Sequence, residues 1–192
     1  MAQTHSDAAG TDNDVVALLM RQHQQIRELF TLVEEATGDT RQEAFGRLRR
    51  LLAVHETAEE EVVHPAARKT FAGGDQVVDQ RLEEERKAKE VLSRLDDMNP
   101  GDPDFMPLFL SLRDAVLEHA EAEERLEFSE LRAHTDPERL AKMAKAVKAA
   151  EATAPTHPHP GAESGKKNMA LGPLASVVDR TRDAVRKAMS KD

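Results

Sequence analysis

The chain has 192 residues, 36 acidic and 27 basic, so its formal net charge is −9. This excess of negative charge argues against a general electrostatic attraction to nucleic acid, and we expect no nucleic acid partner. Only 3% of the residues are aromatic, without tyrosine or tryptophan, which disfavours an all-β fold. The absence of cysteine excludes disulfides, thiolate catalysis, iron–sulfur clusters and cysteine-ligated zinc.

The sequence predicts no targeting signal in the N-terminal region. The first 14 residues lack a basic segment followed by an apolar one, and no run of 18 apolar residues occurs in the chain. We therefore expect a soluble, cytoplasmic protein without a transmembrane segment. Residues 1–12 are expected to form a disordered N-terminus.

Apolar residues recur at the helical period in four long stretches. Pro65 is expected to kink the second helix, and Asp75 is expected to cap the third. Because the connections are short, neighbouring helices must run in opposite directions. The sequence predicts an all-α fold, an antiparallel up-down four-helix bundle over residues 13–134. Its helices run from Asn13 to the turn at 37–39, from about Thr40 to Phe71, from Asp75 to the turn at 99–103, and from about Asp104 to Ala133.

Three further segments follow the bundle. Residues 135–152 are predicted to form a short fifth helix on the end of the bundle, and residues 153–172 a Pro-rich linker. Residues 173–192 are predicted to form a basic amphipathic C-terminal helix, since residues 166–192 hold seven basic and three acidic side chains. This helix either packs on its own chain or serves a protein partner or self-association. Its predicted apolar face comprises Leu174, Val177, Val178, Ala184, Val185 and Met189.

One phrase occurs twice on the predicted helices, as HETAEE from His55 and as HAEAEE from His119, 64 residues later. Residues four apart lie on one face of a helix, so each His can reach a common centre with Glu59 or Glu123. The apolar stripes place these side chains inward, with Leu51, Leu52, Val62 and Val63 on one helix and Leu112, Val116 and Leu126 on the other. Buried carboxylates are costly unless they are compensated, and a pair of metal ions would compensate them.

The other two helices offer further ligands. The first carries His23 on its apolar face, and the third offers Glu85 or Glu84, which periodicity does not separate. The alternative is a buried ionic network without metal, because a single HxxxE pair is common on exposed helices. Four more acids are expected on the solvated face, namely Glu60, Glu61, Glu121 and Glu124.

Together, these residues resemble the hemerythrin-like HHE cation-binding domain, whose pattern is a His on helix one, HxxxE on helix two, a His on helix three and HxxxE on helix four. The resemblance covers about residues 13–134. It implies two iron ions per chain with a bridging oxo or hydroxo group. The implied metal ligands are His23 and His55 on one iron, His119 on the other, Glu59 and Glu123 as bridges, and Glu85 where the family has its helix-three His.

Two positions bear on the character of this centre. A Glu in place of a His favours the ferric state and argues against reversible oxygen carriage. His64 precedes Pro65 at a position that is often aromatic in the family, and Phe128 is its equivalent on helix four. We expect His64 to line the pocket rim or to support the ligands, with ligation as the alternative.

The resemblance implies a non-haem di-iron protein that reacts with peroxide (H2O2), O2 or nitric oxide (NO) in an oxidative or nitrosative stress response. Catalase-like or other peroxide-consuming turnover is left open. The alternative is a metal-binding module that senses or buffers iron or oxygen without turnover. A third reading is a metal-free bundle with a polar core.

Overall fold

The computed structural model describes residues 13–158 and 172–190, with side chains of the last helix from Val177 onward. These residues form helices and turns without a strand, which confirms the all-α bundle. The expected disorder of residues 1–12 and most of the predicted linker lie outside the described residues. The elements are α1 (Val15–Glu35), α2 (Gly38–Ala58), η1 (Glu59–Val63), α3 (His64–Thr70), α4 (Gly74–Asp96), α5 (Phe105–Ala122), η2 (Glu123–Glu127), α6 (Phe128–His134), α7 (Pro137–Glu151) and α8 (Gly172–Ser190), where η marks a π-helical turn.

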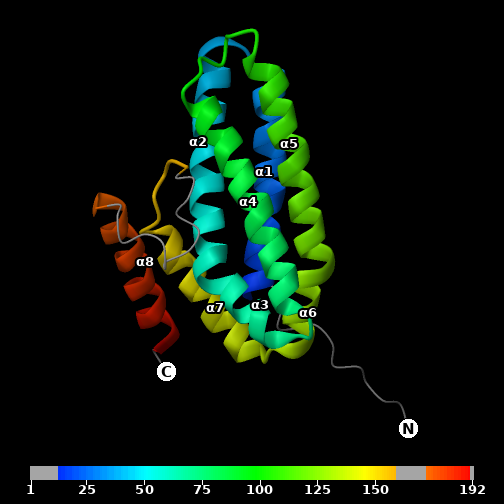
Figure 1. The fold of residues 1–192 in the computed structure, drawn as a ribbon, viewed down its shortest axis with the longest axis vertical. Helices are drawn as coiled ribbons and strands as arrows, with labels where there is room; N and C mark the ends of the chain where they lie inside the picture. The colour runs from blue at the N-terminus through cyan, green and yellow to red at the C-terminus, as the bar shows by residue number, and fades with distance from the viewer. Residues whose placement is uncertain (1–12, 159–171, 191–192) are drawn as a thin grey trace.

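The bundle has four rods, each of which is one helix or a series of consecutive helical segments (Figure 1). The first rod is α1, the second is α2 followed by η1 and α3, the third is α4, and the fourth is α5 followed by η2 and α6. Asp14 caps α1 by accepting a hydrogen bond from the Ala17 amide at 2.7 Å. The predicted cap of the third helix is wrong, since α4 begins at Gly74 after Gly73, whose φ of +84° favours glycine. Asp75 lies instead in the first turn of α4, where its carboxylate pairs with Arg68.

Two of the four rods are interrupted by a π-turn, directly at the repeated phrase. The amide of His64 donates to the Glu59 carbonyl, and the amide of Phe128 donates to the Glu123 carbonyl, in both cases five residues back. On the rod for which a kink at Pro65 is predicted, the helix is irregular in the turn directly before this proline, as a π-turn from Glu59 to Val63. Proline is not required for such a turn, since Ser129 stands at the corresponding position after the second turn and the π-turn forms there as well.

Each π-turn shifts the helical register by one residue. A regular helix places Leu126 on the buried stripe, but that prediction is wrong because Leu126 is 42% exposed. Its neighbour Glu127 is fully buried instead. The π-turn therefore exchanges an apolar residue for a carboxylate inside the bundle.

The exposure of Leu126 leads to a simple test. We expect Leu126→Ser to change the free energy of unfolding by less than about 0.5 kcal/mol, as for most surface substitutions. The matched control is Leu131→Ala on the same rod, which removes a fully buried side chain and should cost about 2–5 kcal/mol. Urea denaturation measures both. A loss at Leu126 comparable to the loss at Leu131 would contradict the π-helical register.

The core consists of two apolar layers with a polar layer between them. One layer lies near the α1–α2 connection and is built around Phe30, Phe45, Phe105 and Phe109. The other lies near the start of α1 and includes Leu19, Val63 and Phe128. On the four rods, the sequence gaps between the two layers contain His23, His55, Glu85, His119 and Glu123, and Glu59 directly follows Ala58 of the second layer.

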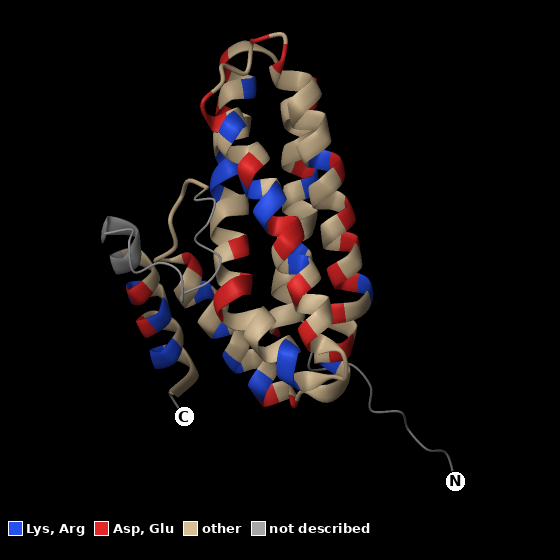
Figure 2. Cartoon of the chain, in the orientation of Figure 1, with Lys and Arg blue, Asp and Glu red and all other residues tan. Residues whose placement is uncertain are grey.

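The helices after the bundle pack on the same chain. α7 contacts α1, α2 and η1, and it contributes Leu140, Met143 and Val147 to the second apolar layer. α8 packs against α7, and Arg182 pairs with Glu61 of η1. Acidic and basic residues alternate along α8 (Figure 2). No helix among the described residues has the length and apolar character needed to cross a membrane.

Candidate metal centre

The six predicted ligands converge between the two apolar layers. His23, His55, Glu59, Glu85 and Glu123 are at most 4% exposed, and the side chain of His119 is 13% exposed. They come from all four rods, and Glu59 and Glu123 are the first residues of the two π-turns. Among the described residues, three groups hold ligand atoms within 4.8 Å of one another. The first is formed by His23, His55 and Glu59 and the second by Glu59, Glu85, His119 and Glu123, while the third, formed by His64, Glu123 and Glu127, adjoins the second through Glu123.

Two carboxylates lie between the first and second groups. Glu59 belongs to both, and its Oε2 lies 3.2 Å from His55 Nε2. The two oxygens of Glu123 lie 3.5 Å from His23 Nε2 and 3.4 Å from His119 Nε2. This arrangement could hold two metal ions with a carboxylate on each side.

Each of the three histidines has its outer ring nitrogen held by an oxygen acceptor. Nδ1 of His23 is 2.8 Å from Glu124, Nδ1 of His55 is 2.8 Å from the Gln22 amide oxygen, and Nδ1 of His119 is 3.0 Å from Glu84. An amide oxygen only accepts, so the His55 Nδ1–H donates and a lone pair remains on Nε2. Such outer partners orient the imidazoles of metal-binding histidines.

The inner nitrogens of His23 and His55 face each other. Their Nε2 atoms are 3.2 Å apart, and burial together with the neighbouring His23 lowers the pKa of His55 to about 3. The His55 ring is therefore neutral at physiological pH. A cation between the two nitrogens would use the lone pair that neutral His55 directs toward His23.

The carboxylates of this layer are deeply buried and poorly satisfied. Both oxygens of Glu59 and of Glu123 lack a hydrogen-bond partner among the described residues. Burial and the nearby Glu123 carboxylate raise the pKa of Glu59 well above its usual value. Burial also acts to raise the pKa of Glu123, but the His119 ring outweighs it and holds that pKa well below the usual value. Bound cations would remove the cost of these uncompensated oxygens.

The structure separates the two candidates on α4. Glu85 is 1% exposed and lies in the second group, with its Oε1 3.9 Å from His119 Nε2. Glu84 has a side chain that is 32% exposed, and it accepts from Arg81 while contacting the outer nitrogen of His119. Glu85 thus faces the predicted centre, and Glu84 contacts His119 from the outer side.

Three of the four acids expected on the solvated face are partly buried, which corrects that expectation. The side chain of Glu61 is 18% exposed and pairs with Arg182 of α8, and the other two are Glu124 and Glu60. Glu124 contacts His23 and also accepts from Arg27 at 2.9 Å. Glu60 has a side chain that is only 13% exposed and pairs with Lys89. Both reach neighbouring rods, which the periodicity of a single helix does not reveal.

Sequence reasoning also missed part of the site around His64. Its Nδ1 is 2.9 Å from Glu127 Oε1 and its Nε2 is 2.6 Å from Glu85 Oε1. His64 and Glu127 are at most 2% exposed. Glu127 carried no sequence signal, because a regular helix places it beside the buried stripe and only the π-turn turns it inward.

Comparison with known proteins was decisive for the family. A family model for the Hemerythrin HHE cation binding domain matches residues 14–131, which is more than half of the chain. The chain belongs to this family. The hemerythrin HHE domain is a cation-binding helical module, and its buried His and Glu groups are where a cation could be held.

Two curated relatives and one solved structure resemble the chain. A DNA nickase of Nostoc sp. is 28% identical over 141 residues, covering 73% of this chain and 40% of the nickase, so the chain spans less than half of that protein. An uncharacterized hemerythrin-like protein of Schizosaccharomyces pombe is 28% identical over 138 residues, with 71% and 68% coverage. The crystal structure of a Hemerythrin HHE cation binding domain-containing protein of Mycobacterium kansasii shares the fold, with a TM-score of 0.64, 18% identity, and coverage of 91% of this chain and 98% of that one.

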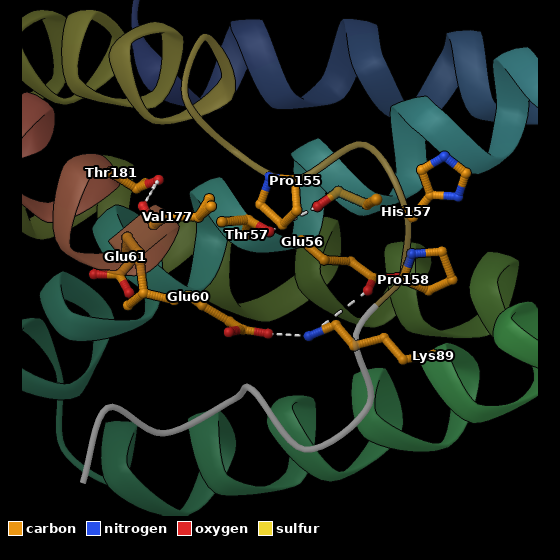
Figure 3. A pocket seen from close by; sticks show the side chains of 12 residues that line it. Glu56, Thr57, Glu60, Glu61, Lys89, Pro155, His157, Pro158, Val177 and Thr181 are labelled. Atoms are coloured by element: carbon orange, nitrogen blue, oxygen red, sulfur yellow. Dashed lines mark hydrogen bonds and ion pairs between the residues drawn. The ribbon is translucent and has the colours of Figure 1, made fainter. Parts of the chain in front are cut away.

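A second pocket, lined by both charged and apolar side chains, lies beside the centre and next to residues 155–158. In Figure 3, Lys89 reaches between Glu56 and Glu60, while Pro155, His157 and Val177 line the pocket. Burial, only partly offset by Lys89, raises the pKa of Glu56 to about 8 and that of Glu60 to about 7. Glu56 lines both this pocket and the cavity among the ligands, so it separates the centre from the pocket.

Proposed function

We propose that this chain is a non-haem di-iron protein that reacts with hydrogen peroxide, dioxygen or nitric oxide. The observation that carries the proposal is the set of three imidazoles whose outer nitrogens are held by Glu124, Gln22 and Glu84, while their inner nitrogens face buried carboxylates. The carboxylates of Glu59 and Glu123 lie 3.2–3.5 Å from histidine nitrogens, yet none of their four oxygens accepts a hydrogen bond among the described side chains, which favours a cation between the groups over a hydrogen-bonded ionic network.

The donor set favours iron among the metals that proteins commonly bind. Imidazole and carboxylate ligands without sulfur suit borderline and hard ions such as iron and manganese. In the proposed arrangement His23 and His55 hold one ion, Glu85 and His119 hold the other, and Glu59 and Glu123 lie between them. The iron pair supplies the redox chemistry, and the protein holds the ligands and limits access.

The shape of the site supports small reactants. The cavity among the ligands has a volume of about 20 Å³ and is bordered by apolar side chains such as Ile26, Leu52 and Val116. A space of this size holds about one water-sized molecule. Bound ions would themselves occupy part of this space, so only small molecules such as peroxide, dioxygen and nitric oxide could reach them, and the apolar border would limit the access of bulk water.

We expect about two iron ions per chain after purification from iron-replete cells without chelator. Metal analysis measures this number, and the bands of an iron centre in the near-ultraviolet are free of interference because the chain has no tyrosine or tryptophan. Gas evolution from added peroxide then tests turnover, while metal-dependent melting without turnover would indicate sensing or buffering. A colourless protein with stoichiometric zinc, or with no metal, would overturn the di-iron proposal.

A further inference from the structure

The two π-turns are related by position but carry different residues at their ends. Each π-turn begins with a proposed ligand, Glu59 or Glu123. The turn ends four residues after this Glu, and the next α-helix begins five residues after it. On the rod that contains α2 these two positions are Val63 and His64, and on the rod that contains α5 they are Glu127 and Phe128. All four are buried.

The residues that directly follow the two π-turns are His64 and Phe128. Each contacts a proposed ligand on one of the two helices, α1 and α4, that offer a single ligand. Phe128 stacks on His23 of α1, with ring centroids 5.4 Å apart and an interplanar angle of 22°. His64 instead contacts Glu85 of α4 at 2.6 Å, and Glu127 holds the other nitrogen of His64 at 2.9 Å. The half of the centre around His23 therefore combines a His ligand with Phe128 and Val63. The half around Glu85 combines a Glu ligand with His64 and Glu127.

We propose that His64 and Glu127 are positioning residues for Glu85, and that these three residues together replace the His, Phe and Val arrangement of the other half. The inference rests on the proposed two-ion centre. It assigns His64 a role through Glu85, so His64 itself is not a ligand.

The contacts explain why Glu85 needs such a partner. Its Oε2 lies 3.9 Å from the Lys89 ammonium, beyond hydrogen-bond distance but close enough to attract the carboxylate. The short contact from His64 holds Oε1 on the opposite side, 3.9 Å from His119 Nε2. A carboxylate oxygen has two lone pairs, so Oε1 can accept from His64 and still face the centre.

Glu127 fixes the ring that performs this task. Its Oε1 contacts His64 Nδ1, and its side chain is fully buried. Without His64, Glu127 would be a buried carboxylate with neither oxygen hydrogen-bonded among the described side chains. This dependence explains why a His at position 64 and a Glu at position 127 occur together.

The test measures iron bound per chain and the visible spectrum after metal-free protein is loaded anaerobically with Fe(II) and passed over a desalting column. Wild type should retain about two ions. His64→Phe should retain about one, because Glu85 turns toward Lys89. His64→Gln should retain about two, because the Gln amide N–H can still donate to Glu85. The control His134→Phe changes an imidazole that is 54% exposed and should match wild type.

A triple variant tests whether Glu85, His64 and Glu127 together replace the His, Phe and Val arrangement of the other half. Glu85→His, His64→Phe and Glu127→Val together reproduce in the half around Glu85 the residues of the half around His23, and we expect this variant to regain two iron ions with a spectrum changed from wild type. Thermal melting of each metal-free variant shows whether it is folded. If the triple variant does not fold, the comparison of His64→Phe with His64→Gln still decides the proposal.

The outcomes separate this inference from the proposed function. Wild type without iron would overturn the di-iron proposal itself. Wild type with two ions, together with two ions and an unchanged spectrum in His64→Phe, would overturn only the positioning role. Loss of an ion in His64→Gln as complete as in His64→Phe would also overturn it, since the imidazole would then act as a ligand.

Discussion

Replacing His55 with alanine should release iron from the first group and leave at most one ion per chain. His55 contributes the inner nitrogen that faces His23 at 3.2 Å, and its outer nitrogen is fixed by Gln22. Its loss leaves Glu59 as a buried carboxylate with one imidazole fewer, and breaking a buried charged site costs about 3–5 kcal/mol. For a chain of this size that corresponds to a fall in melting temperature of roughly 10 °C.

The comparison of His55→Ala with wild type must separate the stability lost with the metal from the stability lost with the side-chain packing. Calorimetry of the iron-loaded proteins should show the full difference, whereas the metal-free forms should differ less, because bound metal stabilises only the folded state. His134→Ala is the matched control, since that side chain is 54% exposed. Full iron loading in His55→Ala would exclude His55 as a ligand.

Replacing Phe109 with alanine should destabilise the protein strongly without removing iron. Phe109 is fully buried, and its ring centroid lies 5.4 Å from that of Phe30 and 5.7 Å from that of Phe105. Removing such a ring from a packed core costs about 3–5 kcal/mol. Urea denaturation of the metal-free protein measures the loss, and iron analysis below the transition should still give the wild-type value.

Phe128→Ala provides the contrast. Phe128 is equally buried, but it stacks on His23 in the layer next to the ligands. This substitution should therefore lower both stability and iron content. If Phe109→Ala also lost iron, the apolar layer around Phe109 would not be independent of the polar layer, contrary to their separation in the structure.

The regular spacing of residues along an α-helix accounts for most of what the sequence predicts about the fold and the site. The four rods follow from the recurrence of apolar residues, since a helix buries one face at a fixed spacing. His55, Glu59, His119 and Glu123 follow from the repeated phrase, because residues four apart share a face. Glu85 required the family resemblance, since periodicity left Glu84 equally acceptable.

The errors arise where the helices are irregular or where one rod touches another. A π-turn has no strong residue signature, and it moves every later residue of the rod to a new direction. The prediction for Leu126 was therefore wrong and Glu127 was missed. The contact between Glu124 and His23 joins residues 101 positions apart, so no local pattern in the sequence could indicate it.

The packing of α7 has a consequence for where the folding unit ends. The family match stops at residue 131, and the last bundle helix stops at His134. Yet α7 supplies six buried side chains, and its Glu151 accepts from the Gln22 amide that holds His55. A fragment cut after His134 would expose apolar surface along α1 and α2 and would leave Gln22 without that acceptor. The smallest fragment of this chain that preserves both core layers and the outer support of His55 therefore extends through Glu151.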